Sequence, residues 1–136
     1  MSDKILPITV AETEKFRKEV KKLLKRYNSA RKDIEPLIKQ LEAGEIPGDR
    51  IAENKYPVYK VRVANSDTRK GKSSGYRVIY YTITPESILL TTIYSKSDRR
   101  TISNKEVEDI IWQYELEIQQ ETEIVETDSE DSDALS

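Results

Sequence analysis

The stretch Val58-Tyr59-Lys60-Val61-Arg62-Val63 decides the fold class, because apolar and charged residues alternate along it with a period of two. Such alternation is typical of a β-strand with one buried and one solvated face. The segment 76–83 is apolar on both faces apart from Arg77 and Thr82, as expected of a central strand. A proline-containing turn then leads into a third strand over 88–94. Three consecutive strands with short connections predict an antiparallel meander.

Upstream of these strands, apolar residues recur at helical spacing. A short strand over 5–10 is expected to open the chain, and an amphipathic helix with a basic outer face follows over 11–28. Asp33 as N-cap and Pro36 in the first turn predict a second helix that ends at Gly44. We expect the two helices to form an antiparallel hairpin packed on one face of a small antiparallel sheet. The opposite face would then carry the basic side chains.

The remaining segments are predicted from their composition. The segment 45–57 has few apolar residues and is predicted to be a loop. Ser103 and Glu106 form a capping box that starts a last helix, in which Trp112 is expected to be part of the core. From Glu121 onward Glu, Asp, Ser and Thr dominate, a composition that buries too little apolar surface to fold by itself.

The sequence therefore predicts an α+β domain over 1–120, followed by a disordered acidic tail over 121–136. Charge is divided in the same way. Residues 1–105 contain all 23 Lys and Arg and 13 of the 25 Asp and Glu, which gives a net charge of +10, whereas residues 106–136 contain the other 12 acids. A basic body favours a polyanionic partner such as RNA or DNA. Its alternatives are an acidic protein partner, or the chain's own tail folded over the basic face in competition with RNA.

Two absent residue types restrict the chemistry. The chain has no cysteine, so disulfides and thiolate metal sites are excluded, and a reducing cytoplasm fits this composition. It has no histidine, so a catalytic site must use Lys, Arg, Tyr, Ser or carboxylates. The sequence shows no long apolar run, so no membrane partner is expected. Carboxylates in predicted loops lack metal-ligand spacing, and we expect neither a metal nor another cofactor.

A basic cluster on the sheet is the strongest candidate site. Lys60 and Arg62 are two positions apart on one strand and so project from the same face. Arg77 lies within an otherwise apolar strand, where a charge is costly unless it meets a ligand or an acid. Lys96 follows the third strand. These four residues suit metal-free cleavage of RNA by its ribose 2′-OH, which needs a proton acceptor, a proton donor and cations around the phosphate. The alternative is that alternating Lys and Arg only form a solvated strand face.

Other residues are predicted to bind RNA without taking part in the chemistry. They are basic residues of two loops and two tyrosines that could stack on bases: Arg69, Lys70, Lys72, Arg99, Arg100, Tyr81 and Tyr94.

Three segments together resemble the RelE/HigB toxins of the RelE/ParE superfamily, from bacterial type II toxin–antitoxin systems. They are Val58-Tyr59-Lys60-Val61-Arg62, then Gly71-Lys72-Ser73-Ser74-Gly75-Tyr76-Arg77-Val78-Ile79-Tyr80-Tyr81, and Ile93-Tyr94-Ser95-Lys96-Ser97. The resemblance covers roughly residues 5–115. It implies a microbial RNase fold, metal-independent cleavage of messenger RNA in the ribosomal A site, and a cognate antitoxin that holds the toxin inactive in a hetero-oligomer.

The resemblance also implies roles for individual residues. Lys60 and Arg62 match the basic strand pair that supplies the base and phosphate contacts, and Arg77 matches the arginine that stabilises the transition state. Past Tyr94 the pattern departs from the family, so that either Lys96 or Arg99 could replace a further arginine, and the general acid stays open. A ParE-like gyrase inhibitor, which lacks this basic set, and an inactive RNA- or ribosome-binding module are the alternatives.

Overall fold

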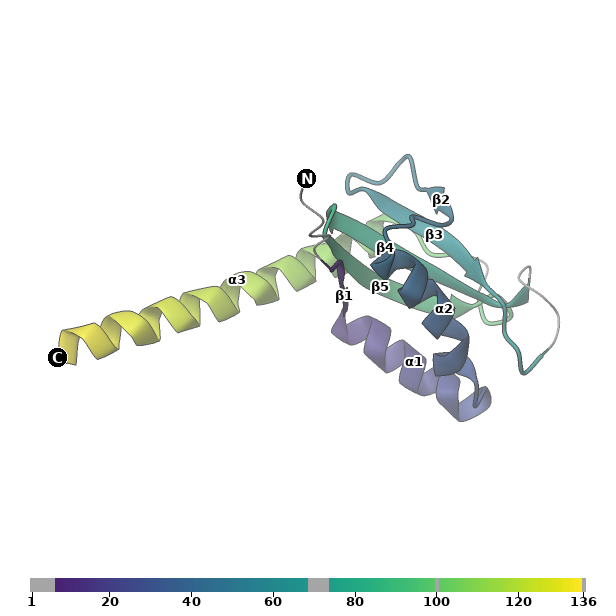
Figure 1. Ribbon diagram of the computed structural model, residues 1–136, viewed down its shortest axis with the longest axis horizontal. Coiled ribbons are helices and arrows are strands. Elements are labelled where there is room, and N and C mark those ends of the chain that lie inside the picture. The colour runs from purple at the N-terminus through teal and green to yellow at the C-terminus, as the bar shows by residue number, and fades with distance from the viewer. Residues whose placement is uncertain (1–6, 69–73, 100, 136) are drawn as a thin grey trace, which may run out of the picture.

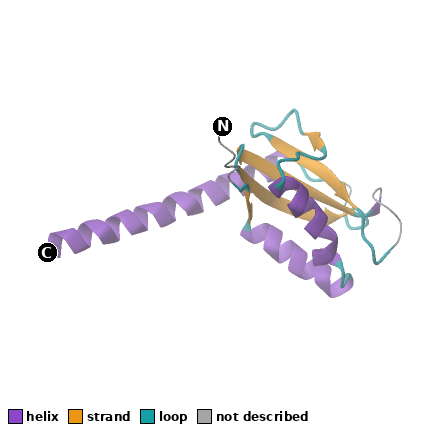
Figure 2. Ribbon diagram, in the orientation of Figure 1, coloured by secondary structure: helices purple, strands orange, loops and turns teal. Residues whose placement is uncertain are grey.

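The computed structural model describes residues 7–68, 74–99 and 101–135. Over these residues the chain is an α+β protein with three helices and a five-stranded mixed sheet (Figure 1, Figure 2). In chain order the elements are β1 (Thr9–Glu12), α1 (Glu14–Arg26), α2 (Ala30–Glu42), β2 (Asp49–Arg50), β3 (Val58–Val63), β4 (Tyr76–Thr84), β5 (Ser87–Ser95) and α3 (Asn104–Leu135).

The sheet has the strand order β1-β5-β4-β3-β2. Its centre is the antiparallel meander β3-β4-β5 that the alternation predicts. The expectation of a wholly antiparallel sheet is wrong, because β1 pairs with β5 in parallel. The expected loop over 45–57 also contains a strand, β2, which pairs antiparallel with β3. Two residues are too few to produce an alternating pattern, so sequence periodicity cannot detect β2.

Thr13 joins β1 to α1. Its hydroxyl accepts a hydrogen bond from the Phe16 amide at 2.9 Å and donates to the Thr91 carbonyl at 2.7 Å. The first bond caps the helix, and the second fixes that end of the helix against β5. Helix α1 therefore begins at Glu14 rather than at residue 11.

The hairpin of α1 and α2 packs on one face of the sheet, as expected (Figure 1). Helix α2 begins at Ala30, so Asp33 lies inside it and is not its N-cap. The Asp33 carboxylate instead accepts hydrogen bonds from the Ser29 hydroxyl at 3.3 Å and the Ser66 amide at 3.0 Å. This tertiary contact joins the helix to the segment after β3, and Pro36 lies within the helix on its exposed side.

Helix α3 packs on the sheet face opposite the hairpin. Val107 and Ile111 of α3 form a second apolar cluster with Val58, Ile79 and Tyr94 of the sheet. Trp112 is not part of this core, because it is 56% exposed. It follows Ile111 by one residue, and consecutive residues of a helix point about 100° apart.

Helix α3 spans Asn104–Leu135. The division at residue 120 and the disorder beyond it remain predictions from composition. The 32 residues of α3 correspond to a length of about 48 Å, and its second half projects from the body (Figure 1). Glu is a good helix former, whereas the Asp, Ser and Thr that are also frequent in this segment are not. None of the helices in the described ranges is long and apolar enough to cross a membrane.

Candidate nucleic-acid interface

The basic side chains meet on the sheet face opposite the helical hairpin. Arg62 of β3 lies directly across from Arg77 of β4, and Arg77 lies across from Tyr94 of β5. Lys60 is two residues before Arg62 on the same face, in register with Ile79. Val61 and Val63, which alternate with these residues along β3, pack toward the hairpin. Lys60 and Arg62 therefore project together from the opposite face, as the alternation predicts.

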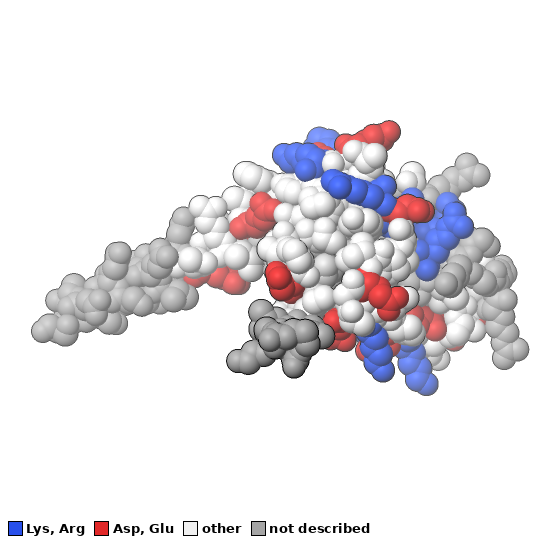
Figure 3. Space-filling view, turned by 45° about the horizontal axis from the view of Figure 1, so that its top comes forward, with Lys and Arg blue, Asp and Glu red and all other residues white. Residues whose placement is uncertain are grey.

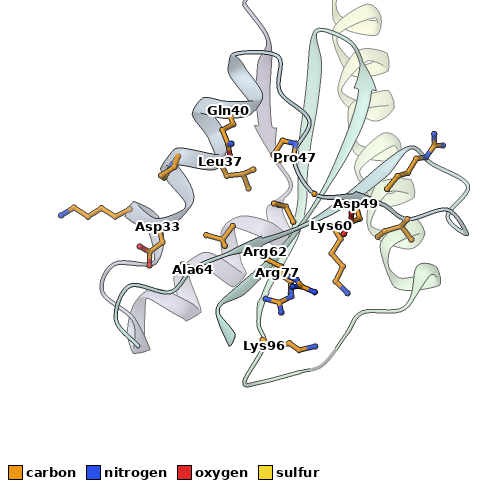
Figure 4. A pocket seen from close by; sticks show the side chains of 17 residues that line it. Asp33, Leu37, Gln40, Pro47, Asp49, Lys60, Arg62, Ala64, Arg77 and Lys96 are labelled. Atoms are coloured by element: carbon orange, nitrogen blue, oxygen red, sulfur yellow. The ribbon is translucent and has the colours of Figure 1, made fainter. Parts of the chain in front are cut away.

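These side chains line a cleft of about 980 Å³. Lys60, Arg62, Arg77 and Lys96 all contribute to its wall, and Figure 4 shows their amino and guanidinium groups pointing toward one another. Residues of α2 and the segment Pro47–Ile51 complete the lining. In the space-filling view, Lys and Arg line the upper and right side of the body with some Asp and Glu among them, and others lie at its lower edge (Figure 3). The cleft thus presents several cations to one bound group.

Arg77 is the most buried of these cations. Its side chain is 5% exposed, and Nη1 donates to the Tyr76 carbonyl at 3.2 Å. Burial lowers the pKa of Arg77, and the positive charge of Arg62 lowers it further. Two like charges placed directly across a strand pair destabilise the sheet. An anion bound between the two guanidinium groups would remove that repulsion, and a phosphate has the geometry for it.

Gly75 makes two close backbone contacts. Its carbonyl accepts a hydrogen bond from the Lys96 amide at 2.9 Å, which holds Lys96 beside the start of β4. A Cβ atom at Gly75 would lie 2.2 Å from the Val63 carbonyl oxygen, so only glycine lets β3 and β4 approach here. The glycine that precedes Tyr76 and Arg77 therefore has a physical reason, because it brings the start of β4 against the end of β3.

The geometry separates Lys96 from Arg99, which the sequence left as alternatives. Lys96 lines the cleft, whereas Arg99 does not. Arg99 donates to the Glu106 carboxylate at 3.1 Å and to the Thr101 carbonyl at 2.9 Å. The Arg99 guanidinium also lies 5.7 Å from the centre of the Tyr94 ring. Arg99 thus holds the loop after β5 to the first turn of α3, and Lys96 is the candidate that faces a ligand.

The two tyrosines expected to stack on bases lie elsewhere. Tyr94 is only 5% exposed and packs in the cluster under α3, so its ring offers no open face to a base. Its hydroxyl is buried and has no hydrogen-bond partner among the described residues. Tyr81 does not line the cleft and packs against Tyr56, with ring centres 5.3 Å apart. Burial raises the pKa of Tyr81, and the nearby Glu115 raises it further, which makes this end of the face unfavourable for an anion.

Four of the predicted RNA-binding residues lie outside the described residues. They are Arg69, Lys70, Lys72 and Arg100.

Sequence reasoning missed the part of the cleft that comes from β2. Asp49 is in register with Lys60, and Arg50 with Tyr59, and both residues of β2 line the cleft. Gly48 allows this pairing, since its φ is +91° and a Cβ there would lie 2.4 Å from the Lys60 carbonyl oxygen. The signal in the sequence is the Pro47-Gly48-Asp49 triplet, which predicts a turn but not what the turn contacts.

The arrangement can hold a phosphate and exchange protons beside it. Arg62 and Arg77 supply planar donors that match phosphate oxygens. Lys60 and Lys96 each present an amino group that can take up or release a proton. In the described ranges no group of three or more acidic residues is placed to hold a metal ion.

A comparison of the chain with protein-family models, curated proteins and solved structures found no match.

Proposed function

We propose that this protein is a metal-independent endoribonuclease of the RelE type, the toxin of a type II toxin–antitoxin system. The observation that carries the proposal is the convergence of Lys60, Arg62, Arg77 and Lys96 in one cleft. These residues come from two strands, β3 and β4, and from the loop after β5, so a merely solvated strand face does not account for their meeting. The α+β architecture, with a helical hairpin on an antiparallel meander, agrees with the RelE-like microbial RNase fold that we propose for the chain.

In the proposed reaction the ribose 2′-oxygen attacks the adjacent phosphorus, and the bond to the 5′-oxygen of the next nucleotide breaks. The Lys60 amino group takes the 2′-OH proton. Arg62 and Arg77 bind the non-bridging oxygens and stabilise the charge that grows on them, a role worth on the order of 100- to 1000-fold in rate per donor. Lys96, as an ammonium ion, gives a proton to the 5′-oxygen. The products are a 2′,3′-cyclic phosphate and a 5′-hydroxyl end, and no metal ion takes part.

The proposed substrate is messenger RNA in the ribosomal A site, in the cytoplasm. This part of the proposal is supported by the resemblance of the Lys60–Arg62 strand and of the segment Gly75-Tyr76-Arg77 to RelE toxins. A positively charged body of net charge +10 suits a ribosomal RNA surface. A cognate antitoxin would hold the toxin inactive in a hetero-oligomer by covering the cleft.

Primer extension on a message in a reconstituted bacterial translation reaction tests the nuclease. We expect discrete cuts in translated regions with the wild type, none without ribosomes, and loss of cutting by at least about 100-fold with Arg77→Ala. Lys39→Ala is the matched control, because Lys39 is an exposed cation of α2 that does not line the cleft. Cutting should survive chelation of divalent ions when it is followed on a pre-formed ribosome complex.

A second candidate function is binding of RNA without cleavage, on the same cleft. The cleft itself supports it, because cations that hold a phosphate do not by themselves require cleavage. An intact message, with ribosome binding that Arg77→Ala weakens, would establish this function and remove the nuclease. An intact message with no ribosome binding would leave the gyrase-inhibitor alternative to be tested next, by supercoiling assay.

A further inference from the structure

The cleft is larger than a single phosphate requires, and it has a different chemistry on each side of β3. Its volume is about 980 Å³. The four cations of the proposed phosphate site lie on one side of β3 (Figure 4). The wall on the other side includes four neutral residues, which are Pro36, Leu37, Gln40 and Pro47. Lys32 and Asp33 of α2 also line the cleft, and their charges are opposite, so α2 gives this side no net charge that would attract a second phosphate.

The edge of β3 that separates the two sides is only partly paired. Strand β2 covers it as far as Lys60, which is in register with Asp49. The same register would place Pro47 beside Arg62, but proline has no N–H to donate to the Arg62 carbonyl. The Pro47 carbonyl in turn accepts a hydrogen bond from the Tyr80 hydroxyl. The pairing of β2 with β3 therefore ends at Lys60, and the next part of the edge is open to the cleft.

The open edge presents one backbone N–H and one backbone C=O. In an antiparallel strand both groups of a residue point to the same side, and that side alternates from one residue to the next. The Val58 carbonyl accepts a hydrogen bond from the amide of Ile51, just after β2, at 2.9 Å. Lys60 and Arg62 follow Val58 at intervals of two residues and point to the same side. The N–H and C=O of Arg62 therefore point away from β4 and into the cleft, where β2 no longer covers them.

A nucleobase fits this opening better than a peptide strand does. Arg62 is the one outward-pointing residue of β3 beyond β2, because β3 ends at Val63. A strand usually has at least three residues, so a single paired residue gives an added strand too few hydrogen bonds. A base presents donors and acceptors side by side along one edge of its ring. One backbone N–H and one C=O are enough to bind such an edge.

Helix α2 supplies side chains for the same ligand. Pro36 and Gln40 are four residues apart, so they share one side of the helix. Both are exposed, and both line the cleft. Pro36 offers an apolar ring to the face of a base, and the Gln40 amide offers a donor and an acceptor to its edge. A charged ligand group would gain little from these two residues, whereas a neutral heterocycle matches both.

We infer that the α2 side of the cleft is a nucleobase subsite. The phosphate lies between the Arg62 and Arg77 side chains, and an adjoining base reaches around the open edge of β3. There the edge of the base meets the Arg62 backbone and the Gln40 amide, and its face lies against Pro36. The inference rests on the proposed function for the identity of the ligand as RNA. It makes Gln40 a residue that determines base preference.

Binding of uncleavable single-stranded RNA tests the subsite apart from catalysis. The probes are 2′-O-methyl hexanucleotides of adenosine, cytidine or uridine and a hexanucleotide with the same backbone and no bases, followed by fluorescence anisotropy. We expect the wild type to bind the best of the three base-containing probes at least about fivefold more tightly than the weakest. Gln40→Ala should remove most of that difference and leave binding of the abasic chain unchanged. Gln120→Ala is the control and should keep the preference, because Gln120 is an exposed glutamine of α3 outside the cleft.

Arg62→Gln separates the subsite from the phosphate site, because it removes the guanidinium group and keeps the backbone N–H and C=O. It should weaken binding of all four probes by a similar factor and keep the base preference. If Arg62→Gln weakens binding but the wild type has no base preference, or keeps it in Gln40→Ala, the base subsite is overturned and the phosphate site stands. If Arg62→Gln binds every probe as tightly as the wild type does, the phosphate site is refuted, and the subsite with it.

Discussion

Replacing Arg62 with Gln tests two effects of this residue separately: its effect on the free energy of unfolding and its effect on RNA binding. Arg62 is exposed and lies directly across β3 and β4 from Arg77, which is 5% exposed. Like charges directly opposite in a sheet destabilise by about 0.2–1 kcal/mol, and glutamine removes the charge while keeping most of the side-chain length. Arg62→Gln should therefore raise the free energy of unfolding by that amount. For a chain of this size the melting temperature should rise by roughly 1–4 °C.

The same substitution should weaken RNA binding. We propose that Arg62 contacts a phosphate, and loss of one such contact lowers the slope of log affinity against log salt by about 0.7 for a single strand. Fluorescence anisotropy with a short single-stranded RNA, over a series from about 50 to 200 mM salt, measures that slope. Calorimetry of the free protein measures the melting temperature.

The two readouts together decide the role of Arg62. Lys39→Gln is the control, because it removes one exposed positive charge outside the cleft. It should change neither the slope nor the melting temperature by a comparable amount. A fall of several degrees in the melting temperature of Arg62→Gln would show that Arg62 holds the sheet together. The repulsion argued from its position across from Arg77 would then be refuted.

Three further predictions follow from backbone fit, tyrosine burial and capping. Gly48→Ala should destabilise by about 1–3 kcal/mol in urea unfolding, because its φ is +91° and the added Cβ meets the Lys60 carbonyl; an unchanged midpoint would contradict this. Tyr76→Phe should leave the free energy of unfolding at pH 7 unchanged or raise it, since the buried Tyr76 hydroxyl has no partner among the described residues. Tyr80→Phe should lower the free energy of unfolding by about 1 kcal/mol, because the Tyr80 hydroxyl donates to the Pro47 carbonyl. Burial raises the pKa of both tyrosines, so the native state keeps protons that the unfolded chain loses above about pH 10; stability should fall there, and less steeply in Tyr76→Phe. Thr13→Ala should cost about 1–2 kcal/mol by removing the cap of α1 and the bond to Thr91, and a loss below about 0.3 kcal/mol would show that neither bond contributes.

The central strands could be predicted from the sequence because their pattern depends on burial alone. The alternation over Val58–Val63 and the apolar run from Tyr76 both became strands, in the antiparallel order that short connections favour. The parallel edge strand β1 could not be oriented in advance. Its direction depends on how α1 returns across the sheet, and the Thr13–Thr91 bond that fixes this joins residues far apart in the chain.

The last helix shows where periodicity fails. Its apolar residues indicated a buried face but not which sheet face it would cover, because both faces of β4 and β5 are apolar. Composition predicts disorder from Glu121, and this stays a prediction. Low hydrophobicity argues against a packed core, but it does not prevent a helix from continuing into solvent, because extending a helix costs less than nucleating one.

In the candidate site, the informative residues are those that are unfavourable for the local structure in which they lie. Arg77 stands in an apolar strand where a charge is costly, and Arg62 faces it where an opposite charge would be favourable. Gly48 and Gly75 lie just before β2 and β4, and each permits a close backbone contact with β3 or the residues that follow it. The glycines are explained by the close backbone contacts with β3 that they permit. The pairing of Arg62 with Arg77 is what the proposed function would explain, because a phosphate bound between the two guanidinium groups would offset their repulsion.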